Sequence, residues 1–209
     1  MTADFASVTA GTGILPVLTV QSAATAAPLA EALAAGGARC AEVTLRTPDA
    51  ERVLRTMAAH GGLTVGAGTV LTPEQAERAV AAGARFVVSP GFAPDVVEKC
   101  RELQVPVVPG VATATELMRA LRAGLDTVKL VPAETLGGPA ALRALAAPFP
   151  GVHFVPTGGI TADRMPTYLD VPAVLAVGGS WMAPADHLES GDYAQIRRLT
   201  AQAVARSLT

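Results

Sequence analysis

The stretch CAEVTLRTPDAERVLRTMAAHGGLTVGAGT (40–69) decides the fold of this chain, because it contains one complete strand–helix–strand unit. Its first part, CAEVTL (40–45), and its last part, LTVGAGT (63–69), are short runs with β-like composition. The segment between them has apolar residues at helical spacing and ends at Gly61, a residue type that the end of a helix prefers. This order predicts two parallel strands with a helix packed outside them.

The same alternation repeats along the whole chain. Six further runs have the character of strands: ILPVLTV (14–20), FVVSP (86–90), VPVVPGV (105–111), TVKLVP (127–132), HFVPTGG (153–159) and AVLAVGGS (173–180). The eight runs begin about 20 to 26 residues apart, with Ala-rich helical segments between them. Eight such units close into a barrel. We therefore predict a (β/α)8 TIM barrel, formed as a single domain by residues 1–209, with a short extra helix at about residues 2–12.

Composition and charge exclude several classes of protein. Half of the 209 residues are hydrophobic, and the formal net charge is -2, so there is no basic surface for nucleic acid. No apolar run approaches the roughly 18 residues that a membrane span needs, and the N-terminus lacks the pattern of a secretory signal. Cys40 and Cys100 form no CxxC pair. We expect a cytoplasmic protein that binds neither nucleic acid nor membrane.

The second run predicts charged side chains inside the barrel. Strand side chains alternate between two faces, so Ala41, Val43 and Leu45 should face the helices. The residues that should face the barrel axis are Cys40, Glu42, Thr44 and Arg46. Glu42 and Arg46 are roughly 13 Å apart along the strand, too far to pair directly. They either fill the interior with other partners, or they belong to a site where Arg46 holds a carboxylate or phosphate.

The sixth run places a lysine in the same interior. Val128 and Leu130 should face the helices, so Lys129 points inward. Lysine is almost never fully buried unless it is paired, and burial disfavours the charged form of an amine and makes it more nucleophilic. Lys129 is therefore a candidate Schiff-base lysine. The alternatives are that it reaches the barrel mouth or pairs with Glu42, and pairing is compatible with catalysis.

The last two runs end in glycine pairs, Gly158-Gly159 and Gly178-Gly179. This corner of a TIM barrel often binds phosphate through backbone N–H groups, and glycine lets the backbone approach an anion closely. The alternative is a pair of ordinary strand-to-helix turns. Thr69, after the third strand, could hydrogen-bond a substrate oxygen. The three histidines have no metal-ligand spacing, so we expect no metal site.

In seven stretches the chain resembles the 2-keto-3-deoxy-6-phosphogluconate (KDPG/KHG) aldolase family. These are EVTLRTP (42–48), VGAGTVLTPEQ (65–75), FVVSPGF (86–92), VPVVPGVATATE (105–116), VKLVPAETLGG (128–138), APFPGVHFVPTGGI (147–160) and VGGSW (177–181). They occur in order between residues 42 and 181, and the resemblance as a whole extends over the chain from about residue 14 to residue 181. The resemblance implies a homotrimeric (β/α)8 barrel that uses no metal or other cofactor.

The resemblance also implies a role for each matching residue. Lys129 would form the imine with the 2-keto carbon, and Glu42 would move protons, through a water molecule. Arg46 and Thr69 would hold the carboxylate end of the substrate, with Pro90 lining the pocket. The phosphate would be held by Gly158, Gly159 and Ser180. Thr157 matches a position linked in the family to stereoselectivity at carbon 4.

The implied activity is that of a class I aldolase of the Entner–Doudoroff pathway. It would cleave 2-keto-3-deoxy-6-phosphogluconate (KDPG) to pyruvate and D-glyceraldehyde 3-phosphate, with 4-hydroxy-2-oxoglutarate (KHG) as a second substrate. Two departures concern substrate preference: Val131 stands where relatives commonly have an aromatic residue, and Thr19 where many have arginine. The alternatives are the galactonate epimer as substrate, a phosphosugar isomerase or epimerase with Glu42 and Lys129 as base and acid, and a sugar-phosphate-binding protein without activity.

Overall fold

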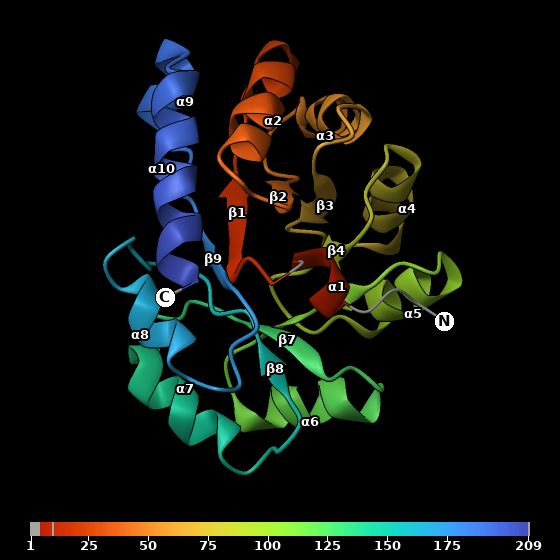
Figure 1. Ribbon diagram of the computed structural model, residues 1–209. Coiled ribbons are helices and arrows are strands. Elements are labelled where there is room, and N and C mark those ends of the chain that lie inside the picture. Colours follow the sequence, from red (N-terminus) through yellow and green to blue (C-terminus); the bar gives the residue numbers. More distant parts are fainter. Residues whose placement is uncertain (1–4, 10, 209) are drawn as a thin grey trace.

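The computed structural model describes residues 5–9 and 11–208, and its strands form a closed ring of parallel neighbours (Figure 1). The strand segments of the described residues are β1 Ile14–Leu18, β2 Cys40–Thr44, β3 Thr64–Gly68, β4 Val87–Val88, β5 Val107–Val108, β6 Gly110–Val111, β7 Thr127–Leu130, β8 His153–Phe154 and β9 Val177–Gly179. Their order is β5-β4-β3-β2-β1-β9 in one sheet and β6-β7-β8 in the other. Single bridges, Phe154 to Val174 and Thr157 to Gly178, join the last two strands. The predicted (β/α)8 barrel is confirmed.

The predicted fifth strand, 105–111, is interrupted at Pro109, which separates β5 from β6. Proline has no N–H group and cannot donate to a neighbouring strand. Its carbonyl still accepts a hydrogen bond from the Lys129 N–H at 2.9 Å. The seventh strand is also shorter than predicted, but Val155 and Thr157 continue to donate to the sixth, at 2.8 and 2.9 Å.

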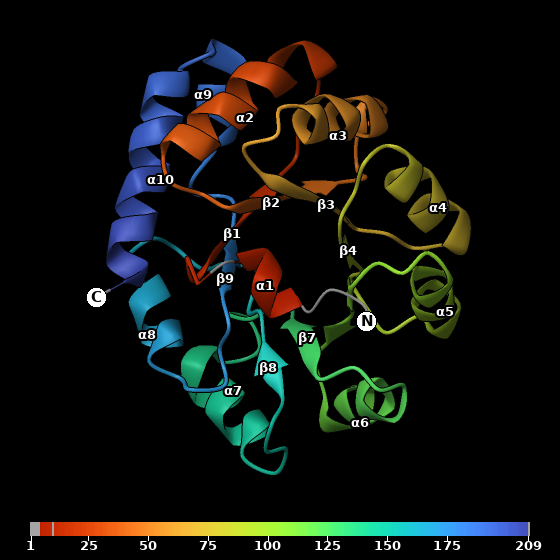
Figure 2. The same cartoon turned by 45° about the vertical axis from the view of Figure 1, so that its right-hand side comes forward.

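The helices surround the strands in Figure 2, as the strand–helix alternation predicts. They are α2 Ala26–Ala35, α3 Ala50–Ala59, α4 Pro73–Ala81, α5 Pro94–Glu102, α6 Ala114–Arg122, α7 Gly138–Ala146, α8 Met165–Leu169, α9 Ala185–Ser190 and α10 Tyr193–Ser207, with a 3-10 turn at Ala23–Thr25 before α2. The start of α4 shows how local sequence sets these ends. The Thr72 hydroxyl accepts from the Gln75 N–H, and Pro73 occupies the first turn.

The extra helix before the first strand is α1, Phe5–Thr9. The predicted helix, 2–12, was too long at its C-terminal end, because Gly11 and Thr12 are not helical. Residues 2–4 and 10 of that prediction lie outside the described residues. In Figure 2, α1 lies within the ring of strands, next to where β1 begins.

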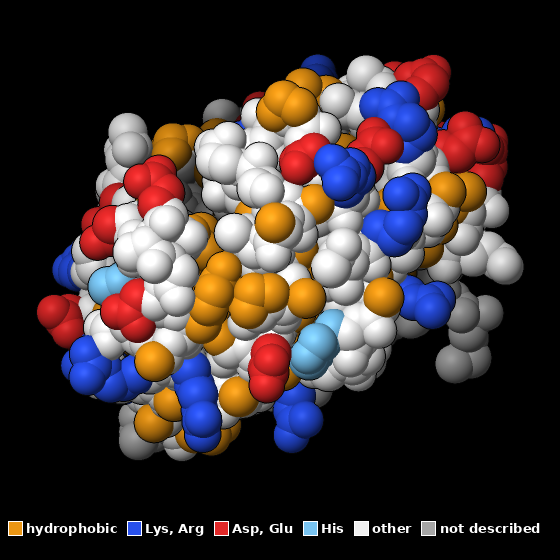
Figure 3. Space-filling view, turned by 90° about the horizontal axis from the view of Figure 1, so that it is seen from above, with side chains coloured by type: hydrophobic (Ala, Val, Ile, Leu, Met, Phe, Trp, Pro, Cys, Tyr) orange, Lys and Arg blue, Asp and Glu red, His pale blue; other side chains and the backbone are white. Residues whose placement is uncertain are grey.

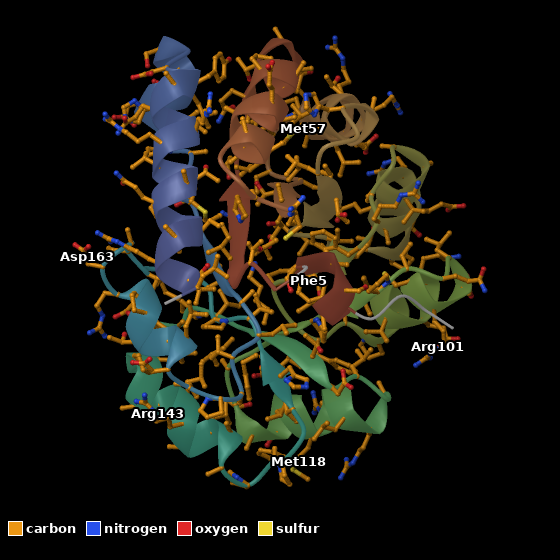
Figure 4. All side chains as sticks on the ribbon, in the orientation of Figure 1. Phe5, Met57, Arg101, Met118, Arg143 and Asp163 are labelled. Atoms are coloured by element: carbon orange, nitrogen blue, oxygen red, sulfur yellow. The ribbon has the colours of Figure 1, made fainter. Side chains whose placement is uncertain are left out.

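The core has one layer between strands and helices and another inside the barrel. Ala41 and Val43 of β2 pack in the outer layer with residues of α2 and α3. The inner cluster consists of Phe5, Val8, Leu15, Cys40, Phe86, Val88, Val108 and Val155. Phe5 meets Phe86 edge to face, with ring centroids 5.2 Å apart. Figure 4 shows Phe5 near the centre of the molecule, so α1 closes the N-terminal end of the barrel.

The outer surface carries both signs of charge. In Figure 3 acidic and basic side chains are intermixed over the visible face. Some of them form exposed ion pairs, such as Arg78 with Glu51 at 2.7 Å, which contribute little to stability. No helix among residues 5–9 and 11–208 has the length and apolar character that crossing a membrane requires.

Candidate active site

Strand β2 directs side chains to both faces, and its inward face carries the first site residue. Ala41 and Val43 pack toward the helices, whereas Cys40 belongs to the cluster inside the barrel. Glu42 and Thr44, on the same face as Cys40, are buried with 0% and 1% of their surface exposed. The predicted alternation is therefore confirmed, and it brings a carboxylate into the barrel interior.

Lys129 of β7 meets Glu42 inside the barrel. The Lys129 ammonium group, Nζ, lies 3.2 Å from Oε1 and 3.4 Å from Oε2 of Glu42. Strands β2 and β7 are not neighbours in the ring, so the pair spans the interior. Removing one partner would leave a buried, unpaired charge, at a cost of about 3–5 kcal/mol. Pairing with Glu42, one of the alternatives that the sequence left open for Lys129, is therefore observed, and it is compatible with catalysis.

Gly68 of β3 makes room for this pair. A Cβ atom at Gly68 would overlap the carboxyl group of Glu42, although the backbone there is ordinary extended strand. A glycine inside a strand often marks such a close approach. The sequence places Gly68 near the end of the third run but does not indicate its effect on Glu42.

A pocket of about 250 Å³ opens above the ion pair, at the C-terminal ends of five consecutive strands, β7, β8, β9, β1 and β2. It is lined by Val17, Thr19, Arg46, Lys129, Val131, Thr157, Gly158, Gly159, Ile160, Gly178, Gly179 and Ser180. Six of the predicted site residues are in this group, and Glu42 lies beneath them against Lys129. The structure thus brings together residues from distant parts of the sequence at the end of the barrel where TIM-barrel sites lie.

Two predicted site residues lie beside the pocket and do not line it. Thr69, which adopts the left-handed φ of 58°, accepts a hydrogen bond at 3.1 Å from Nε of Arg46. Thr69 thereby fixes the direction of the Arg46 guanidinium group. Pro90 is exposed after β4 and packs closely against Gly110 through its backbone.

The glycine corner presents free backbone donors to the pocket. Gly158 and Gly159 have φ values of 104° and 77°, which only glycine adopts readily. Within the described part of the chain, the N–H groups of Gly158, Gly159 and Ser180 donate to no protein acceptor. Consecutive free N–H groups in such a turn form a concave site for an anion.

Thr157 connects this corner to the floor of the pocket. It is buried, and its hydroxyl donates to the Val155 carbonyl at 3.3 Å. A Cβ atom at Gly178 would overlap its hydroxyl oxygen, so the first glycine of the second pair makes space for Thr157. Gly178 therefore allows Thr157 to approach β9 closely at the bridge between the two strands.

A larger cavity, about 510 Å³, lies at the other end of the strands, between α3, α4 and the start of β3. Arg55 and Arg85 line it, but none of the predicted site residues does. We place the site in the smaller pocket, because that pocket contains the buried lysine and the free N–H groups.

Fold and site together define a barrel enzyme with a buried lysine–carboxylate pair below an open pocket. A family model described as KDPG and KHG aldolase matches residues 6–199. A 2-dehydro-3-deoxy-phosphogluconate aldolase of Treponema pallidum is 50% identical over 190 residues, 90% of each chain. The chain belongs to the KDPG and KHG aldolase family.

Solved structures of relatives agree with this assignment. The 2-keto-3-deoxy-6-phosphogluconate aldolase of Zymomonas mobilis, solved with 3-phosphoglycerate, has a TM-score of 0.92 and 43% identity, covering 98% of this chain and 97% of that one. A KDPG aldolase from Legionella pneumophila, with pyruvate captured at low pH as a covalent carbinolamine, also has a TM-score of 0.92. Its identity is 39%, and the match covers 96% of this chain and 98% of that one.

Proposed function

We propose that this protein is a class I aldolase that cleaves KDPG to pyruvate and D-glyceraldehyde 3-phosphate. The observation that carries the proposal is Lys129, whose amine lines the pocket while it contacts the buried carboxylate of Glu42 at 3.2 Å. Membership of an aldolase family makes the enzyme a carbon–carbon lyase. The family description joins KDPG with KHG, so KHG is the proposed second substrate.

The reaction would begin at the Lys129 amine, once it has transferred a proton to Glu42. Its lone pair attacks the 2-keto carbon to give a carbinolamine, and Glu42 returns its proton to the carbinolamine hydroxyl, which leaves as water to give a protonated imine and a Glu42 carboxylate. The imine accepts the electron pair of the bond between carbons 3 and 4 when that bond breaks. A base must remove the proton of the carbon 4 hydroxyl, and Glu42 would do this directly or through one water molecule. Hydrolysis of the protonated enamine then releases pyruvate.

The remaining site residues would hold the two ends of the substrate. Arg46, oriented by Thr69, would bind the carboxylate, since a guanidinium group matches a carboxylate in bidentate fashion. The free N–H groups of Gly158, Gly159 and Ser180 would bind the phosphate. Thr157 would face carbon 4, where the stereochemistry is decided. Pro90 would border the pocket on the β4 side.

Borohydride trapping with pyruvate tests the proposal. The experiment can assign the modified residue, because Lys99 and Lys129 are the two lysines of the sequence. Lys99 lies on α5 and pairs with Glu102 at 2.6 Å, and that hydrogen bond raises its pKa, which keeps its amine protonated. We expect one pyruvyl group on the peptide containing Lys129, and the same result in Lys99→Arg.

The same experiment separates the alternatives. A phosphosugar isomerase or epimerase would use Glu42 and Lys129 without a covalent adduct, and a binding protein would turn over no substrate. Absence of an adduct while phosphosugar isomerisation is observed would overturn the aldolase proposal. Cleavage rates for KDPG and its galactonate epimer measure the stereochemical preference.

We further propose that residues 1–209 form one domain and that the enzyme is a cytoplasmic homotrimer without a metal or organic cofactor. The family resemblance supports the trimer, and the closure of the strand ring around α1 supports one domain. Light scattering should give a mass three times that of the 21.2 kDa chain. Cleavage should be unaffected by a chelator.

A further inference from the structure

Thr19 follows β1 and lines the same pocket as Lys129. Strand β1 pairs with β9 on one side and with β2 on the other. Thr19 therefore lies between Ser180, which follows β9, and Arg46, which follows β2. In the proposed binding mode these two residues hold opposite ends of the substrate, so Thr19 faces the carbons between them.

A chain of hydrogen bonds fixes the orientation of the Thr19 hydroxyl. The Thr44 hydroxyl lies 2.9 Å from the Leu18 carbonyl oxygen and 2.9 Å from the Thr19 hydroxyl. A carbonyl oxygen only accepts, so Thr44 must donate its one proton to Leu18. The hydrogen bond between the two threonines then requires Thr19 to donate to Thr44.

Because the Thr19 hydroxyl donates its one hydrogen to Thr44, it cannot donate a hydrogen bond to a molecule in the pocket. Thr44 is 1% exposed, so water does not compete for its hydroxyl. Thr19 is exposed at the pocket and presents only its oxygen lone pairs there. A substrate hydroxyl can donate to that oxygen, whereas a carboxylate or phosphate oxygen would meet another acceptor.

We infer that Thr19, oriented by Thr44, is a specificity-determining residue that accepts a hydrogen bond from the carbon 5 hydroxyl of the substrate. The inference rests on the proposed function. KDPG carries a hydroxyl at carbon 5, whereas carbon 5 of KHG is a carboxylate. Thr19 favours the first and disfavours the second, and Thr44 is a positioning residue that sets this preference.

The test compares kcat/KM for KDPG with kcat/KM for KHG in wild type and four variants. Thr19→Val keeps the shape and removes the acceptor, so the ratio of KDPG to KHG should fall about tenfold, the value of one hydrogen bond. Thr44→Val frees the Thr19 proton to point into the pocket, and the ratio should fall through better use of KHG. Thr19→Ser and Thr44→Ser each keep both hydroxyl groups, so the ratio of the two kcat/KM values should stay at the wild-type value.

Three results would overturn the inference. The first is an unchanged ratio of the two kcat/KM values in Thr19→Val and Thr44→Val. The second is an equal loss of kcat/KM on both substrates in these variants. The third is a ratio in the serine variants as low as that in the valine variants. Thermal unfolding and pyruvate trapping on Lys129, measured for every variant, show that the barrel and the imine chemistry are intact. Failure of the proposed function is a different result, because wild type itself would then form no pyruvate adduct.

Discussion

The two ends of the barrel interior differ in chemistry, although the same strands supply both. At the N-terminal end the interior is apolar, with Phe5, Cys40 and Phe86 in one cluster. At the C-terminal end it contains the Glu42–Lys129 pair. Along β2 the interior changes from the apolar cluster, at Cys40, to the charged pair, at Glu42, within two residues. Burial and the nearby charge of Glu42 raise the pKa of Cys40 to about 12, so its thiol stays protonated.

Two glycines of β3 show the same separation between the apolar end and the charged end of the barrel interior. A Cβ atom at Gly66 would overlap the Phe86 ring, and one at Gly68 would overlap the Glu42 carboxyl group. One glycine therefore makes room for packing and the other for a charged pair. The comparison teaches that stability and chemistry are separated along the barrel axis, so substitutions at the two ends should affect different measurements.

The largest expected effect is that of Lys129→Met. Without the amine no imine forms, and cleavage of KDPG should fall on the order of 10⁴-fold or more. The substitution also leaves Glu42 buried without a partner, so the free energy of unfolding should fall by about 3–5 kcal/mol. Adding Glu42→Gln should recover part of that stability and none of the activity. Full stability of the single variant in urea would contradict this account of the pair.

Phe86→Ala changes the other end of the barrel. Loss of this buried ring should lower the free energy of unfolding by about 3–5 kcal/mol, because a cavity remains beside Phe5. Denaturant titration measures this, and pyruvate trapping on Lys129 should persist below the unfolding transition. If the adduct disappears while the protein is folded, the two ends are not independent.

Glu42→Gln should slow cleavage by about 10²-fold or more, because the amide cannot act as a base. The similar shape should keep the barrel folded, which circular dichroism checks. Glu98, which pairs with Arg101 on the exposed surface, gives the control Glu98→Gln, with unchanged kcat. Wild-type turnover of Glu42→Gln would remove Glu42 from the mechanism.

The smallest and most selective effects are expected from the two β3 glycines. Gly66→Ala should lower the free energy of unfolding by about 1–3 kcal/mol, the usual cost of overpacking, with little change in kcat. Gly68→Ala should instead reduce kcat, because the added methyl group displaces the Glu42 carboxyl group. Equal changes in stability and kcat for both variants would show that the division along β3 does not hold.

Much of the barrel could be predicted because strand and helix periods are local properties. The alternation of β2 and β7 gave the inward direction of Glu42 and Lys129 correctly, and the eight runs gave the closed ring. The lengths of the strands were less accurate. Pro109 divides the fifth strand, and the regular part of the seventh ends at Phe154 while the backbone that follows still pairs with β7.

The contacts within the site could not be predicted, since they join segments far apart in the chain. Gly68 gave a weak signal as a glycine inside a strand, but nothing local indicates that its neighbour is Glu42. The free N–H groups of Gly158 and Gly159 depend on φ values that the sequence permits without requiring. The proton order from Thr19 through Thr44 to Leu18 depends on the register of β1 against β2.

By itself, the sequence determined the order of strands and helices and the face on which each strand residue lies, because a side chain's direction follows from a period of two residues. Tertiary structure alone decided that Glu42 and Lys129, 87 residues apart, meet at 3.2 Å, and that α1 closes the opposite end. Closure of the ring fixes these distances, and closure depends on all the strands at once.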